Sequence, residues 1–172
     1  MSTIDAKDGS KLLVIYYSRS GNTELLAKEF ARYYQAPLVH LEANDYRIGV
    51  SGLFNALLDS RDKHAVITPE KIDLSQCNTL FIGSPIWSYS PAPPVWQFIE
   101  SNQLTDKNIV LFTTYNSSFK QEYIDEFKGR VEAQGGNFVR HIHVRRGRMM
   151  GQISDAVLLK KGIEQLIDLQ LY

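Results

Sequence analysis

The sequence predicts one α/β domain in which helices cover both faces of a five-stranded parallel sheet. Short apolar runs alternate with segments of helical periodicity along the chain, and 172 residues suffice for a single domain with a full core. Strict alternation of strand and helix requires crossover connections, which produce a parallel sheet. With the most polar strands at the edges, the fold is doubly wound with strand order 2-1-3-4-5.

Five runs rich in Val, Ile, Tyr and Phe predict the strands. They cover Leu12–Tyr17, Leu38–Leu41, Thr79–Gly83, Ile109–Thr113 and Phe138–Val144. The second and fifth runs carry polar residues and predict the two edges, whereas the others are almost continuously apolar. The strand starts at 38 and 79 lie farther apart than the others, so an enlarged segment lies between Glu42 and Gln76.

Apolar residues spaced three and four apart predict a helix after each strand. The apolar positions are Leu26, Phe30 and Tyr33; Leu53, Leu57 and Leu58; Val95, Phe98 and Ile99; Ile124, Phe127 and Val131; and Leu159, Ile163, Leu166 and Ile167. Ser118 and Gln121 form a capping box that predicts the start of the fourth helix. Residues 1–10 are expected to be a flexible extension of a domain that spans residues 1–172.

Composition excludes several classes of function. Lys and Arg number 19 and Asp and Glu number 19, so the chain lacks the basic excess of a nucleic-acid-binding domain. The apolar run Leu12–Tyr17 is too short to span a bilayer, and residues 1–11 lack the apolar core of a signal peptide. Cys77 is the single cysteine, which excludes an internal disulfide. We therefore expect a cytoplasmic protein that binds neither nucleic acid nor membrane.

The loop after the first strand has the composition of an anion-binding site. It leads into the first helix, where free amide groups favour a phosphate, and its glycine permits a tight turn. Its residues are Ser18, Arg19, Ser20, Gly21, Asn22 and Thr23. The chain has neither a GxxxxGK[ST] motif nor a GxGxxG motif, so a nucleoside-triphosphate site and a conventional dinucleotide site are disfavoured. A run of this kind also serves as an ordinary turn and helix cap.

The loops after the third and fourth strands combine aromatic and polar residues. Carboxyl ends of parallel strands meet at one edge, so these loops are expected to lie beside the first loop. They are Pro85, Ile86, Trp87, Ser88 and Tyr89, and Thr113, Thr114, Tyr115, Asn116 and Ser117. Trp87 and Tyr89 are candidates for flat walls beside a planar ring, although an aromatic side chain in a loop more often packs into the core.

The residues SRSGNT, Ser18 to Thr23, and GSPIW, Gly83 to Trp87, resemble the flavodoxin family and its NAD(P)H-dependent oxidoreductase relatives. The resemblance extends from about Leu12 to Leu169 and implies a flavodoxin-like fold that binds FMN. It implies that residues 18–23 hold the phosphate, that residues 85–89 border the isoalloxazine with Trp87 as the stacking residue, and that residues 113–118 meet its pyrimidine side.

The chain departs from the family pattern in three ways. Its net charge is zero, whereas electron-shuttling flavodoxins are typically acidic. Ser88 stands where relatives often have the glycine of a flipping peptide, which favours two-electron chemistry because a positive φ is unfavourable for serine. The interval between the last two strands leaves no room for the insertion of long-chain members.

Two further groups are interpreted as structural. His141 and His143 share one face of a strand, as a metal pair does, but no third ligand is adjacent, so we expect solvated positions on an edge strand. Arg145, Arg146 and Arg148 are expected in a solvated loop, with an anionic partner or the 2′-phosphate of NADPH as the alternative. We assign no metal ligand and no catalytic side chain.

The resulting functional prediction is a flavodoxin-like redox protein that transfers electrons through non-covalent FMN. It acts either as an electron carrier with a redox partner protein or as an NAD(P)H-dependent reductase of quinone-like acceptors. The alternative is an interaction module that keeps the fold without the cofactor. The sequence leaves the oligomeric state open.

Overall fold

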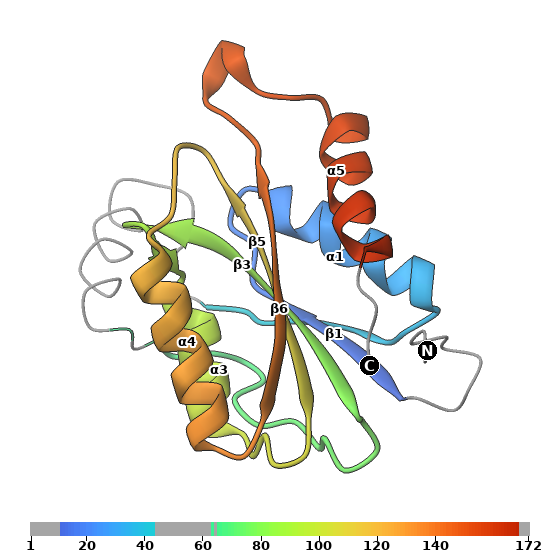
Figure 1. The fold of residues 1–172 in the computed structure, drawn as a ribbon, viewed down its shortest axis with the longest axis vertical. Helices are drawn as coiled ribbons and strands as arrows, with labels where there is room; N and C mark the ends of the chain where they lie inside the picture. Colours follow the sequence, from blue (N-terminus) through green and yellow to red (C-terminus); the bar gives the residue numbers. More distant parts are fainter. Residues whose placement is uncertain (1–10, 44–62, 64, 169–172) are drawn as a thin grey trace.

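The computed structural model describes residues 11–43, 63 and 65–168, which form alternating strands and helices around one sheet (Figure 1). The elements, in chain order, are β1 Leu12–Tyr16, α1 Asn22–Tyr34, β2 Leu38–His40, β3 Thr79–Trp87, β4 Ser90–Pro91, α3 Pro93–Ser101, β5 Asn108–Tyr115, α4 Gln121–Ala133, β6 Asn137–Arg145, the short 3-10 helix η3 Met149–Gly151 and α5 Asp155–Ile167. The expected extension 1–10 and the helix expected around Leu53–Leu58 lie outside the described residues.

The sheet has the order β2-β1-β3-β5-β6, and all neighbouring pairs along this path are parallel. The short strand β4 lies off the path and pairs antiparallel with β3. The five parallel strands therefore have the order predicted from the sequence, with the two more polar strands, β2 and β6, at the edges. The predicted flavodoxin-like doubly wound architecture is confirmed.

The strands alternate their side chains between two apolar clusters, one on each face of the sheet. In β1, Leu13 and Ile15 join the cluster that α3 and α4 cover, whereas Leu12 and Val14 join the cluster that α1 and α5 cover. Figure 1 shows these two helix pairs on opposite sides of the sheet. Both faces of the central strands are buried, which explains their nearly continuous apolar sequences.

The predicted start of α4 is wrong. The helix begins at Gln121, with Lys120 in extended conformation at the cap position and no side-chain cap. The amide of Lys120 donates to the carbonyl oxygen of Tyr89 at 3.0 Å. This tertiary contact favours an extended Lys120, which leaves Ser118 outside the helix and overrides the capping-box signal.

In the part of the chain that the structure describes, no helix combines the length and apolar character needed to cross a bilayer.

Gly83 in β3 permits close packing of the central sheet. A Cβ atom there would lie 2.2 Å from Cζ of Phe112 in the neighbouring strand. We expect Gly83→Ala to lower the free energy of unfolding by about 1–3 kcal/mol, because the core cannot expand without strain. Urea denaturation followed by circular dichroism measures this change.

Gly129 provides the matched control, because it lies in α4 and a Cβ atom there would meet nothing within 4 Å. Gly129→Ala is expected to raise the free energy of unfolding by about 0.5–1 kcal/mol, since alanine is the better helix former. Equal stability changes in the two variants would contradict the packing described for Gly83.

Candidate functional site

The loop between β1 and α1 forms a turn at the carboxyl end of β1 and leads directly into α1. Gly21 has φ 86°, a conformation that glycine adopts easily, and its amide donates to Oγ of Ser18 at 3.1 Å. Among the described residues, no side chain caps the start of α1. The first amides of a helix lack partners within the helix, so this N-terminus suits an anion. Ser20 is exposed beside it, while Arg19 and Asn22 are half-buried.

A buried hydroxyl contact joins the first and third predicted loops. Oγ1 of Thr23, near the start of α1, lies 2.8 Å from Oγ1 of Thr114 in β5. The two residues are only 1% and 3% exposed. One of the hydroxyls must donate its proton to the other, so this pair retains a single proton for a ligand. The contact fixes the start of α1 against the end of β5.

The segment expected as a loop after the third strand is a β-hairpin. Ile86 and Trp87 pair with Pro91 and Ser90, and β3 therefore extends four residues beyond the predicted end at Gly83. Pairing with β1 stops at Gly83, so β3 has lost that neighbour where Pro85 occurs. A proline is tolerated where a strand has become an edge.

The turn of this hairpin has positive φ at both central residues, 47° at Ser88 and 70° at Tyr89. Two such residues define the type I′ geometry that matches the twist of paired strands. The structure therefore already contains the positive φ that the sequence argument treated as an obstacle at Ser88. The inference that Ser88 favours two-electron chemistry consequently loses its basis.

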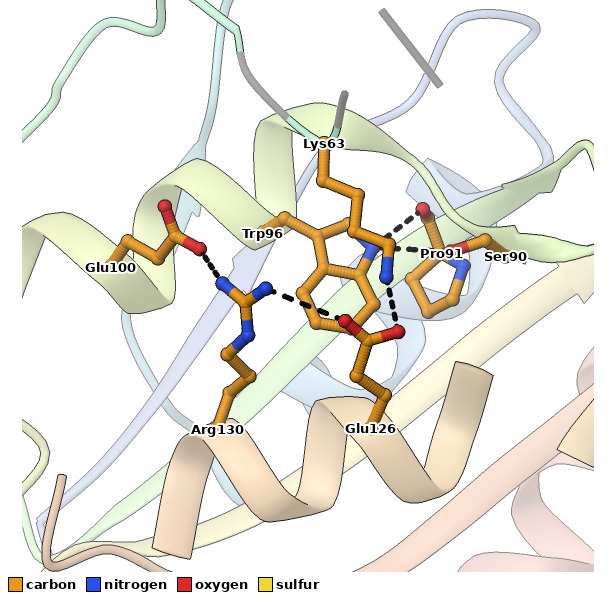
Figure 2. Close-up of polar contacts among 7 residues, drawn as sticks. All are labelled: Lys63, Ser90, Pro91, Trp96, Glu100, Glu126 and Arg130. Atoms are coloured by element: carbon orange, nitrogen blue, oxygen red, sulfur yellow. Dashed lines mark hydrogen bonds and ion pairs between the residues drawn. The ribbon is translucent and has the colours of Figure 1, made fainter. Parts of the chain in front are cut away.

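Trp96 of α3 contacts the second strand of the hairpin, at Ser90 and Pro91 (Figure 2). Its indole N–H donates to the carbonyl oxygen of Pro91 at 2.9 Å and approaches Oγ of Ser90 at 3.2 Å. The Trp96 ring is fully buried. Oγ of Ser84 also accepts from the amide of Ala92 at 2.8 Å. These bonds hold the second strand of the hairpin in a unique register.

Charged side chains cover the outer side of Trp96, as Figure 2 shows. Nζ of Lys63 lies 4.5 Å from the ring centroid and pairs with Glu126 of α4. Arg130 of α4 lies 5.7 Å from the same ring and pairs with Glu100 of α3 and with Glu126. Cations over an indole ring stabilise it by about 0.5–2 kcal/mol. The cluster thus joins α3, α4 and residue 63 around the base of the hairpin.

Aromatic rings connect the hairpin to the end of β1. The centroid of Trp87 lies 5.5 Å from that of Tyr17, and the rings meet edge to face. Burial raises the pKa of Tyr17 to about 12, so its phenol stays neutral near pH 7. Trp87 is half-buried, whereas Tyr89 is 50% exposed, with Nζ of Lys120 at 5.8 Å from its ring. Sequence reasoning did not identify Tyr17 or Lys120 as site residues, although Tyr17 directly precedes the first loop.

The end of β5 also pairs with edge strand β6 through two histidines. Nε2 of His141 lies 2.8 Å from Oγ1 of Thr113, and Nδ1 of His143 lies 3.3 Å from the phenol oxygen of Tyr115. Phe119 packs edge-on against both imidazoles, with each ring centroid 5.0 Å away. Burial lowers the pKa of His141 to about 3 and lowers that of His143. His141 is half-buried, which corrects the expectation of two solvated histidines.

Among the residues that the structure describes, no group of three His, Cys, Asp or Glu side chains is arranged to hold a metal ion. Cys77 is half-buried, and burial raises the pKa of its thiol.

The three predicted loops lie at one edge of the sheet and contact one another through Thr23 and Thr114, Trp87 and Tyr17, and Lys120 and Tyr89. Thr113 and Thr114 direct their hydroxyls to opposite faces, because one contacts His141 and the other contacts Thr23. Asn116 and Ser117 are exposed beyond the end of β5. The edge therefore combines a helix N-terminus for an anion with aromatic rings for a planar group.

The hydroxyl pair predicts a specific pattern of stability changes. We expect Thr23→Val and Thr114→Val each to lower the free energy of unfolding by about 1–3 kcal/mol, because each leaves a buried hydroxyl unpaired. The double variant should lose less than the sum of the two. A double-mutant cycle from urea denaturation measures this coupling, and strictly additive losses would contradict the contact.

His141 predicts a pH dependence of stability. Its pKa is about 3 in the folded protein against about 6.5 when unfolded, so only the unfolded chain binds a proton between these values. The contribution of neutral His141 to the free energy of unfolding is complete above about pH 6.5. It declines as the pH falls, by about 1.4 kcal/mol per pH unit at most. His141→Gln should reduce the loss of unfolding free energy between pH 7 and pH 5. His143 is exposed, so His143→Gln should reduce this loss less. An unchanged pH dependence in His141→Gln would contradict this assignment.

Comparisons with known proteins agree with this architecture. One similar structure is a flavoprotein in complex with FMN from Lactobacillus acidophilus NCFM. It is 22% identical, with TM-score 0.65 and coverage of 78% of this chain and 93% of that chain. Oxidised Flavodoxin 1 from Bacillus cereus is 21% identical, with TM-score 0.55 and coverage of 94% of this chain and 100% of that chain. At these identities the likeness concerns the fold.

A third similar structure is the Trp repressor binding protein from Bacillus subtilis, which is 17% identical, with TM-score 0.60 and coverage of 90% of this chain and 99% of that chain. No curated protein matches the sequence significantly. A sequence profile described as Flavodoxin matches residues 11–165, which is most of the chain. The chain therefore belongs to the flavodoxin family.

Proposed function

We propose that this protein binds FMN non-covalently and transfers electrons through it. The observation that carries the proposal is the joining of three loops at the carboxyl edge by the contact between Thr23 and Thr114, the Trp87–Tyr17 ring pair and the bond from Lys120 to Tyr89. The uncapped start of α1 suits a phosphate, and the aromatic rings suit a flat heterocycle. This donor set fits FMN, which has both groups.

The roles follow from the chemistry of each loop. Amides at the start of α1 and the hydroxyls of Ser18 and Ser20 would bind the phosphate, with Arg19 nearby. Trp87 and Tyr89 would border the ring on one side, and residues 113–117 would bind its polar edge. Bound FMN would supply the redox chemistry, so the protein has to position the ring and shield it from water.

Two side chains beside the proposed site, Tyr17 and His141, stay uncharged near pH 7. Tyr17 retains its proton at neutral pH because its pKa is about 12, and His141 remains unprotonated because its pKa is about 3. Neither side chain therefore changes charge between pH 5 and pH 9. These two side chains would therefore not alter the electrostatic environment of a bound ring across this range.

The proposed reaction partner is either a redox protein, with this chain as an electron carrier, or NAD(P)H and a quinone-like acceptor, with this chain as a reductase. Family membership supports both, and the flavoprotein from Lactobacillus acidophilus in complex with FMN supports the choice of cofactor. A net charge of zero gives no long-range attraction to a basic partner, which is compatible with a small-molecule acceptor.

The visible absorption spectrum of the purified protein, before and after addition of FMN, tests the proposal. A yellow protein that releases FMN on denaturation would support it, and no binding of FMN would overturn it and favour the interaction module. Anaerobic titration with NADPH then separates the two roles. Direct bleaching by NADPH indicates a reductase, whereas reduction only by dithionite, in two separate one-electron steps, indicates a carrier.

Ser20 tests the phosphate site without disturbing the core, because its side chain is exposed. We expect Ser20→Ala to weaken FMN binding about tenfold, the effect of one lost hydrogen bond to a charged group, and to leave riboflavin binding unchanged. Fluorescence titration measures both affinities. Ser75→Ala is the control, since Ser75 is exposed and precedes the amino end of β3, at the opposite edge of the sheet. Equal weakening of FMN and riboflavin binding would exclude a phosphate role for Ser20.

A further inference from the structure

Arg146 lies at the end of β6 with its side chain largely covered. Its amide donates to the carbonyl oxygen of Tyr115 at 2.7 Å, and its own carbonyl oxygen accepts from the amide of Ile153 at 2.9 Å. The side chain is 13% exposed. Gly147, with φ 88°, turns the chain directly after it. The structure therefore corrects the expectation that this arginine is solvated.

The Arg146 guanidinium is incompletely paired. Nη2 contacts Oδ1 of Asp155 at 2.6 Å, but the side chain of Asp155 is 60% exposed. Nε and Nη1 are buried and have no hydrogen-bond partner among the described residues. A buried charged donor without an acceptor is strongly unfavourable, and a guanidinium has five N–H groups to satisfy. Such an arrangement favours an anion as an additional partner.

The topology places this charge beside the proposed phosphate site. Thr114 pairs with Val144 and Tyr115 pairs with Arg145, so Arg146 comes next at the carboxyl edge. Its contact with Asp155, the first residue of α5, puts the guanidinium on the face of the sheet that α1 and α5 cover. The hydroxyl of Thr114 meets Thr23 at the start of α1 on that same face.

Packing of α1 against α5 brings the two helix N-termini to the same edge. A Cβ atom at Gly162 of α5 would lie 2.6 Å from Cδ2 of Leu26 in α1, so the helices are in close contact. Figure 1 shows both helices beginning at the end of the sheet where the segment from β6 to α5 stands. Arg146 and the start of α1 therefore lie at the same edge and on the same face of the sheet although they are distant in sequence.

We propose that Arg146 supplies the positive charge that holds the phosphate of the bound flavin, an inference that rests on the proposed function. The other two arginines of this segment differ from it. Arg145 is exposed, with Nε 3.4 Å from the carbonyl oxygen of Asn116, and Arg148 is exposed. Salt screens exposed charges, whereas a buried charge acts at short range with little screening. The three arginines, which look equivalent in the sequence, therefore have different roles.

The two unpaired nitrogens are covered by protein atoms, so binding requires a local adjustment of the guanidinium or of the residues around it. The Asp155 carboxylate is 60% exposed, so water can solvate it when the guanidinium turns toward a phosphate oxygen. Arg146 can thus exchange this contact for a phosphate oxygen without disturbing β6 or α5.

Flavins with and without a phosphate provide the test. Arg146→Gln should weaken FMN binding about ten- to a hundredfold and leave riboflavin binding unchanged, because only FMN carries the phosphate. Arg146→Lys, which keeps the charge, should retain most of the affinity. Arg148→Gln is the matched control and should change FMN affinity less than about threefold, an effect that disappears in high salt. Fluorescence titrations at two salt concentrations measure all of these affinities.

Stability of the apoprotein gives an independent readout. Removal of an incompletely paired buried charge should leave the thermal midpoint of Arg146→Gln equal to or above that of the wild type without flavin. With FMN in excess the order should reverse, because the wild type binds more tightly. A large loss of apoprotein stability would overturn the inference by giving Arg146 a structural role.

The outcomes separate this inference from the function on which it rests. If the wild-type protein binds neither FMN nor riboflavin, the proposed function is wrong and the inference falls with it. If the wild type binds FMN and Arg146→Gln binds it equally well, only the inference is overturned. If Arg146→Gln loses FMN and riboflavin to the same extent, the arginine acts on the ring or the fold and the phosphate role is excluded.

Discussion

Parallel pairing of five strands is the constraint on which the rest of the molecule depends. Every carboxyl end then lies at one edge, and every helix that follows a strand begins there. Polar loops from distant parts of the sequence therefore become neighbours as a direct result of the strand order. The chain uses this geometry through the contact between Thr23 and Thr114, which joins segments 91 residues apart. The site is thus a consequence of topology, refined by a small number of side-chain contacts.

The hairpin turn at Ser88 and Tyr89 has a strained backbone, and buried hydrogen bonds hold the strand that follows it. A type I′ turn at Ser88 and Tyr89 is unfavourable for these residue types, by about 1–2 kcal/mol for each positive φ. Buried bonds from Trp96 and Ser84 to the second strand of the hairpin offset this strain. A strained backbone persists only where the surroundings determine it from several sides, and such positions concentrate at functional sites.

The sequence predicted the sheet because apolar periodicity depends on burial, which a doubly covered parallel sheet imposes on every central strand. It failed where a tertiary contact overrode a local preference. The third strand was expected to end at Gly83, yet β3 continues to Trp87, past Pro85, because its neighbour β1 has already ended. Ser118 suggested a helix start, yet the bond from Lys120 to Tyr89 moves it to Gln121. The burial of Arg146 was equally hidden, because it depends on tertiary contacts, with Tyr115 of β5 and Asp155 of α5, that the sequence does not reveal.

Buried polar side chains distinguish this edge from an ordinary set of loops. Seven polar residues are buried in the described part of the chain, and five of them lie at the carboxyl edge or in its hairpin: Thr23, Ser84, Ser90, Thr113 and Thr114. Each has a partner, and buried polar groups with satisfied hydrogen bonds specify one arrangement at the expense of alternatives. Arg146 is the exception within the described residues. This region therefore pairs its neutral polar groups and leaves one cation incompletely paired, an arrangement that favours an anionic ligand. The N-terminus of α1 on the same face of the sheet favours an anion for the same electrostatic reason.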